Sequence, residues 1–183
     1  MKLQILWFKR IFAGLLALTI IGCVTAISPA PSPKILTDSQ STMTEGLILL
    51  QKMSGGAESG TYDQRKDDYS KLLANLQSIA VLIEARPPGG DLDSDALQKF
   101  LDYAKLKGVI IPVESLGHPN LKAAQNAVVQ MTFLRDIDQN KDCGQSAKCP
   151  TDSNVKLAMK GYITSMGAVI YYEQLLADLK GGG

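Results

Sequence analysis

The chain contains one histidine, one tryptophan and three cysteines in 183 residues, and this scarcity limits the chemistry open to it. His118 stands directly before Pro119 in a predicted turn, with no second histidine near it, so neither a metal centre nor a histidine general base is expected there. The sequence also lacks a glycine-rich phosphate loop, a nucleophile-elbow serine and the Glu-x-x-His motifs of di-metal bundles. We therefore expect no catalytic residue, no cofactor and no enzymatic activity.

A strong excess of either charge is absent as well. The 19 basic and 18 acidic residues nearly balance. Three of the basic residues belong to the amino-terminal segment described next, and without them the formal charge is about −2. A nucleic-acid partner would require a clustered basic face, so we expect none. The hydrophobic content of 45% is that of a globular chain.

The first 23 residues have the anatomy of a bacterial export signal. They begin with a basic stretch, continue with an apolar run over residues 11–21, and place the small residue Gly22 directly before Cys23; the basic residues are Lys2, Lys9 and Arg10. The ending resembles the lipobox of bacterial lipoproteins. The resemblance implies that Cys23 carries diacylglycerol through a thioether, that the signal is cut before it, and that the new amino terminus is acylated.

This segment departs from the usual lipobox and leaves two alternatives open. Ile20 and Ile21 stand where Leu and then Ala or Ser are commoner. An ordinary signal peptidase could cut after Ala26, or the segment could remain as an anchor, although an apolar run over residues 11–27 is marginal against the roughly 20 residues of a spanning helix. All three possibilities export the rest of the chain. Because Val24 rather than Asp follows the cysteine, the sorting rule that the resemblance brings with it favours the outer membrane, facing the periplasm.

The sequence divides into residues 1–22 as the signal, 23–40 as the lipidated cysteine with a Pro/Ser-rich tether, and 41–180 as one domain. The prolines that alternate over residues 28–33 favour extended polyproline geometry. If residues 24–37 were extended at about 3.1 Å each, they would reach about 40 Å from the membrane surface.

Apolar residues recur at helical spacing from residue 41 onwards. They predict an all-α, single-domain, antiparallel bundle of about five helices, near residues 41–53, 62–85, 92–107, 120–136 and 153–179. Capping boxes formed by Thr42 with Glu45, and by Thr61 with Gln64, would open the first two helices. Pro87 disfavours helical geometry at the residue before it and would end the second. Residues 109–113 are too short for a strand without a partner and are predicted to be a buried crossover.

The last predicted helix is apolar nearly all round in its middle, which is typical of a buried helix. It also carries a ridge of small residues that would let a neighbouring backbone approach closely; these are Ala158, Gly161, Ser165 and Ala168. We expect it to be the central core helix, although a face that docks a partner remains the alternative. Glu84 and Glu173 could each face the core, where a lone carboxylate is more often ion-paired than catalytic.

The loop between the last two helices holds the remaining two cysteines, Cys143 and Cys149. In an oxidising envelope, with Cys23 lipidated, they are the only pair left, and their separation suits a disulfide. The spacing of oxygen-bearing side chains before them resembles the first half of an EF-hand; these residues are Asp136, Asp138, Asn140 and Asp142. Lys141 replaces the invariant Gly and Ala147 replaces the bidentate Glu, so we expect solvated loop charges, offset by neighbouring basic residues such as Arg135, rather than a calcium site.

Two functions of different class follow. The first is a membrane-anchored envelope lipoprotein whose helical bundle binds another protein in a structural, assembly, exclusion or inhibitory role. The alternative is a carrier of a small apolar ligand in the bundle core. It is suggested by methionines that can line an adaptable pocket, namely Met43, Met53, Met131, Met159 and Met166.

Overall fold

The computed structural model describes residues 30–86, 94–108, 119–140 and 148–181. Within these ranges the chain forms α2 (Pro33–Lys52), the short 3₁₀ turn η2 (Tyr62–Gln64), α3 (Lys66–Glu84), α4 (Ser94–Leu106), α5 (Pro119–Gln139) and α6 (Asp152–Gly181). The described ranges contain no sheet, and one isolated bridge joins Glu58 to Lys148. The predicted all-α fold with five helices is confirmed.

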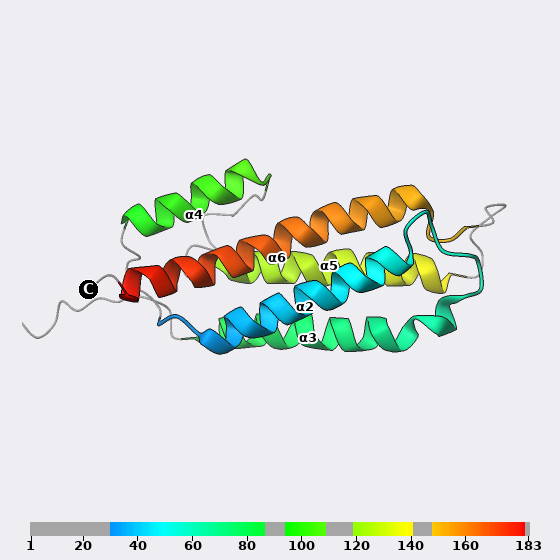
Figure 1. Ribbon diagram of the computed structural model, residues 1–183, viewed down its shortest axis with the longest axis horizontal. Helices are drawn as coiled ribbons and strands as arrows, with labels where there is room; N and C mark the ends of the chain where they lie inside the picture. The colour runs from blue at the N-terminus through cyan, green and yellow to red at the C-terminus, as the bar shows by residue number, and fades with distance from the viewer. Residues whose placement is uncertain (1–29, 87–93, 109–118, 141–147, 182–183) are drawn as a thin grey trace, which may run out of the picture.

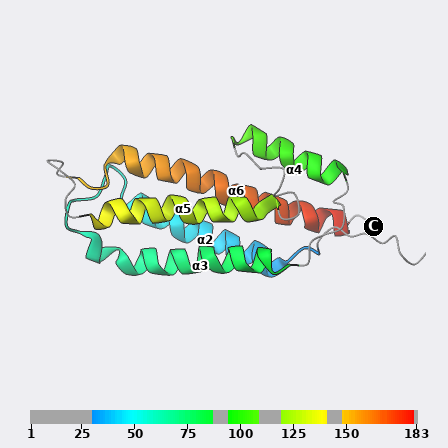
Figure 2. The ribbon, with the colours of Figure 1, turned by 180° about the vertical axis from the view of Figure 1, so that it is seen from behind.

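Four of the helices form a closed ring. α2 packs against α3 and α6, and α5 packs against the same two helices. Successive members of the ring run in opposite directions (Figure 1). α4 lies outside this ring, over the outer side of α6, as the views from both sides show (Figures 1 and 2). The molecule is therefore an antiparallel four-helix bundle with a fifth helix on its surface.

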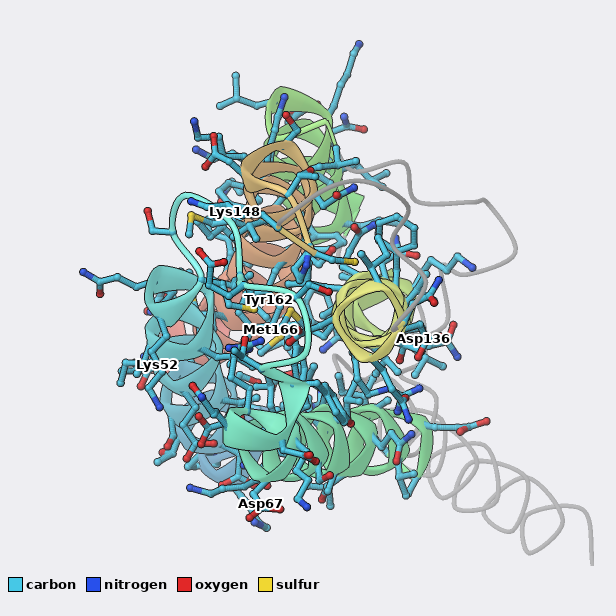
Figure 3. All side chains as sticks on the ribbon, turned by 90° about the vertical axis from the view of Figure 1, so that its right-hand side faces the viewer. Lys52, Asp67, Asp136, Lys148, Tyr162 and Met166 are labelled. Atoms are coloured by element: carbon cyan, nitrogen blue, oxygen red, sulfur yellow. The ribbon has the colours of Figure 1, made fainter. Side chains whose placement is uncertain are left out.

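The interior of the ring is filled by large side chains. Figure 3 looks along the bundle and shows Tyr162 and Met166 of α6 pointing between the helices, whereas Lys52, Asp67 and Asp136 point outwards. α6 packs against α2, α4 and α5, as expected of a central core helix. The largest fully buried side chains are Tyr69, Tyr162, Tyr172, Phe100, Leu50, Met53, Leu72, Leu76, Ile79, Ile83, Met131 and Leu134.

α2 begins eight residues earlier than predicted. Ser32 caps it, because the Ser32 Oγ accepts a hydrogen bond from the Ile35 backbone N–H at 3.3 Å, and Pro33 occupies the first helical position. Thr42, the predicted cap, lies in the middle of the helix and is 2% exposed. The Pro/Ser-rich stretch is therefore partly helical, and only eight residues separate Cys23 from Ser32.

The second predicted capping box is also wrong in its contacts. Thr61 precedes η2 without a side-chain capping bond. Its hydroxyl instead donates to the Glu58 carbonyl at 2.6 Å and accepts from Arg65 Nη2 at 2.9 Å. α3 starts at Lys66 and ends at Glu84, shortly before Pro87, as the proline predicts.

α2 and α6 approach closely at a glycine. A Cβ at Gly46 would overlap the ring of Tyr162, so no larger residue fits there without movement. The Tyr162 hydroxyl donates to the Thr42 carbonyl at 2.6 Å, one turn earlier on α2. The small-residue ridge of α6 is also buried in part: Ala158 and Ala168 are fully buried, and a Cβ at Gly161 would meet the Gln130 side chain of α5.

Some predictions fall on residues outside the described ranges. They are the signal segment with Cys23, the crossover over residues 109–113, and the turn that contains His118. α5 continues to Gln139, three residues beyond the predicted end, because its inward face extends one further turn through Asp138. Asp136 and Asp138 are therefore helical residues.

Candidate functional site

A buried carboxylate at one end of the bundle joins four chain segments. Glu173 of α6 is fully buried, and both of its oxygens lie within 2.8 Å of Arg86 Nη2, just beyond the end of α3. Asn120, in the first turn of α5, donates to Oε1 at 2.8 Å. The backbone N–H of Ser32, the cap of α2, donates to Oε2 at 3.3 Å. We call this set of four residues the Glu173 clamp.

The geometry of the Glu173 clamp is that of a structural contact rather than of a ligand-binding site. Both oxygens of Glu173 already accept two hydrogen bonds each, so the carboxylate is not directed at open solvent or at a ligand. The Arg86 side chain is itself only 8% exposed. Buried ion pairs are retained only with such complete hydrogen bonding, because removing either partner leaves an uncompensated charge. The clamp therefore fixes the start of α2 and α5 and the end of α3 against α6.

A second buried ion pair lies at the opposite end of the bundle. Arg65, directly before α3, donates from Nε to Asp138 Oδ2 at 2.8 Å and from Nη2 to Oδ1 at 2.7 Å. Asp138 is 3% exposed, and this bidentate geometry suits an arginine and a carboxylate. The hydrogen bond to Asp138 raises the pKa of the Arg65 guanidinium above its ordinary value. Each end of the bundle is thus closed by one arginine and one carboxylate.

Two of the four oxygen-bearing residues of the weak calcium candidate, Asp136 and Asp138, each pair with a different arginine. Asp138 is committed to Arg65, and Asp136 pairs with its neighbour Arg135 at 2.7 Å. Asn140 follows the end of α5, and Asp142 lies outside the described residues. Within the described ranges no group of three or more His, Cys, Asp or Glu side chains could hold a metal ion. The pairing of Asp136 with Arg135 is the one that the sequence suggests, whereas the pairing of Asp138 with Arg65 is new.

Cys149 lies in a short segment that is tied to the loop between α2 and α3. Its N–H donates to the Ala57 carbonyl at 2.7 Å, and the Ala57 N–H donates to the Pro150 carbonyl at 2.9 Å. The side chain is buried, with Sγ 3.1 Å from the Ile137 carbonyl oxygen. Cys143, the partner that the sequence predicts, lies outside the described residues, so the disulfide stays a prediction.

Three tyrosines place their hydroxyls in the interior. Tyr69 donates to Met53 Sδ at 3.2 Å, and Tyr162 donates to the Thr42 carbonyl. The Tyr172 hydroxyl is buried and has no hydrogen-bond partner within the described ranges. Burial raises the pKa of all three phenols well above the ordinary value. They are therefore neutral at physiological pH and contribute packing and hydrogen bonds rather than acid–base chemistry.

Two depressions between α2 and α3 are open to solvent and lined mainly by polar side chains. The larger, of about 260 Å³, is lined by Lys34, Asp38, Ser41, Thr42, Asn75 and Ser78. The smaller, of about 110 Å³, is lined by Glu45, Ile48, Leu49, Lys52, Asp68 and Lys71. Ion pairs bridge the two helices here, with Lys71 to Glu45 at 2.9 Å and Lys52 to Asp68 at 2.7 Å. Neither depression is lined by a methionine or has the apolar lining of a typical ligand pocket.

The sequence indicates one of the two buried ion pairs, but it contains little that would predict the other. Glu173 is the only charged residue over residues 161–177, so its need for a partner is visible in the sequence, although Arg86 could not be identified as that partner. Arg65 and Asp138 stand in polar runs beside other charges. Only the position of Asp138, four residues after the inward-facing Leu134, indicates that it faces the core.

The comparisons with known proteins give no relative. The chain matches no protein-family model, no curated protein and no solved structure. No helix within the described ranges is both long and apolar enough to cross a membrane.

Proposed function

We propose that this chain is a lipoprotein of a bacterial cell envelope, held to the membrane through Cys23, and that its helical bundle binds another protein. The anchor rests on the lipobox resemblance of the amino-terminal segment. The binding role rests on how the apolar side chains are distributed. Those in the interior pack against one another, while several large ones on α5 and α6 face solvent.

The solvent-facing residues are the observation that carries the binding role. Val129 is 61% exposed and Phe133 is 46% exposed, and they are four positions apart, so both lie on one side of α5. Leu157, on the adjacent helix α6, is 61% exposed. Exposed aromatic and aliphatic side chains of this size are the contacts from which protein interfaces are built. A partner that covers this side of α5 would bury both residues.

The carrier alternative has less support. Met53, Met131 and Met166 are fully buried, and Met43 and Met159 pack against the same core cluster. Met53 also accepts a hydrogen bond from Tyr69. These contacts are those of core-filling methionines rather than of an adaptable pocket lining.

The proposed anchor also distinguishes the two ends of the bundle. Eight residues lie between Cys23 and Ser32, so even a fully extended chain places Ser32 within about 30 Å of the lipidated cysteine. Glu173 holds the Ser32 backbone at its end of the bundle. The clamp end is therefore the end of the bundle that the chain joins to the proposed anchor.

Site-specific photo-crosslinking in the native envelope tests this function. A photoreactive amino acid at Val129 or Phe133 should give an adduct of one discrete larger mass. The same residue at Ser70 or Gln77, which are exposed on α3, serves as the matched control and should give none. If no position gives an adduct, or all four give the same one, the proposed protein-binding face of α5 is wrong.

A further inference from the structure

α4 differs from the other helices in how it is held. α6 is the helix against which α4 packs, and no other described helix forms comparable packing with it. The four-helix ring closes without α4, which runs along the outer side of α6 (Figures 1 and 2). The position of α4 therefore depends on one surface of α6.

Aromatic rings make that contact. Phe100 meets Tyr172 edge to face, with ring centroids 4.9 Å apart and an interplanar angle of 70°. Tyr103 stacks on Tyr171, with centroids 4.0 Å apart and an angle of 11°. A Cβ at Gly167 would lie 3.4 Å from the Tyr103 hydroxyl, so the glycine leaves room for that ring. Two aromatic residues three positions apart on α4 thus fill a surface formed by Gly167, Tyr171 and Tyr172.

Polar contacts do not reinforce the docking. Among the described residues, no side-chain hydrogen bond or ion pair joins α4 to α6; Gln98 bonds to Asp102 within α4 instead. The Tyr172 hydroxyl is buried and has no hydrogen-bond partner among the residues that the structure describes. A buried hydroxyl without a partner lowers the stability of the state that buries it. The contact of α4 with α6 therefore consists of ring packing, without a polar side-chain contact among the described residues.

The helix itself depends on being docked. α4 has 13 residues, and an isolated helix of that length is marginal in water. Undocking would leave Tyr171 and Tyr172 uncovered beside Gly167, which is an apolar surface of the kind that binds an amphipathic helix. The docking of α4 shows that this surface accepts a helix with aromatic side chains.

We propose that α4 is a self-docked helix that covers a binding surface of α6, and that the protein partner places its own amphipathic helix on Gly167, Tyr171 and Tyr172. That helix carries two aromatic residues three positions apart, as α4 does. The existence of a partner rests on the proposed function, whereas the docking of α4 on this surface is a property of the chain alone.

A labelled synthetic peptide of residues 94–108 tests the surface. In the purified chain with Phe100→Ala and Tyr103→Ala, α4 no longer covers the surface, and the peptide should bind there. The unaltered chain should bind the peptide at least about tenfold more weakly than the double variant does, because its own tethered α4 competes for the surface at high effective concentration. A chain with Lys99→Ala, an exposed position on α4, should behave like the unaltered chain. A peptide carrying both alanines should not bind either chain.

Amide hydrogen exchange on the unaltered chain gives a second reading that needs no variant. The α4 amides should exchange at least about tenfold faster than those of α3 and α5, because α4 opens without unfolding the ring. Equal exchange in α4, α3 and α5 would overturn the proposal. So would failure of the peptide to bind a double variant whose ring amides remain protected. If the peptide binds the double variant but no photo-crosslinked adduct forms at Val129 or Phe133, the docking surface on α6 is supported and the proposed protein-binding face of α5 is not.

Discussion

Glu173 is the residue on which the ends of the helices converge. It accepts hydrogen bonds from the residues that cap α2, follow α3 and open α5, and it does so from a fully buried position on α6. A neutral side chain at this position would leave Arg86, whose side chain is only 8% exposed, without its counter-charge.

Glu173→Gln should therefore lower the free energy of unfolding by about 3 kcal/mol, since one partner of a buried, hydrogen-bonded pair is removed. Urea unfolding monitored by circular dichroism measures it. Glu84→Gln is the control, because Glu84 is exposed in the last turn of α3 and its loss should change stability by less than about 0.5 kcal/mol. Equal effects of the two substitutions would mean that the clamp contributes little.

Individual residues were predictable where hydrophobicity reports burial. The stripe of α3 that the sequence predicts is buried from Tyr69 to Ile83, with only Ala80 partly exposed. Pairings between segments distant in sequence were not predictable. The partners Arg65 and Asp138 are 73 positions apart, and nothing local in the sequence distinguishes Arg65 from the charges beside it.

The start of α2 lies earlier than the sequence predicts because its first residues fit two structures. Prolines before residue 34 resemble a tether, but Ser32 followed by Pro33 is also a normal helix start. Three inward positions of α2 are Ser39, Thr42 and Gly46, which interrupt the apolar stripe in the sequence. The Tyr162 ring of α6 fills the space in front of Gly46, and its hydroxyl bonds to the Thr42 carbonyl, which the sequence of α2 alone does not reveal.

Gly46→Ala tests this close approach. Alanine favours a helix over glycine by roughly 1 kcal/mol, but the added methyl group would overlap the Tyr162 ring, and overpacking typically costs about 1–3 kcal/mol. We expect the free energy of unfolding, measured by thermal unfolding, to fall by about 1 kcal/mol.

Gly161→Ala is the matched control for this change. It is also a glycine inside a helix, but its added Cβ meets the movable Gln130 side chain rather than a fixed ring. Its melting temperature should stay constant or rise. If Gly46→Ala raises the melting temperature as much as Gly161→Ala, α2 and α6 are not in close contact at this point.

For the whole molecule, a buried ion pair closes each end of the bundle, and the proposed anchor would make the two ends unlike. The Glu173 clamp lies where the chain enters from the proposed anchor, and the Arg65–Asp138 pair lies beneath the loops at the far end. If Cys23 carries the proposed lipid, the eight residues between it and Ser32 would limit the distance of the clamp end from the anchor to about 30 Å. The proposed position of the bundle at the membrane therefore depends on whether Cys23 carries a lipid.

Intact-mass spectrometry of the chain extracted from native membranes tests that anchor most directly. The account predicts a polypeptide that starts at Cys23 and carries the added mass of diacylglycerol and an amide-linked acyl chain. Cys23→Ala should leave the uncut precursor, because the thiol that accepts the lipid is missing. An unmodified chain recovered from the soluble fraction, with its amino terminus at any residue other than Cys23, would contradict the account.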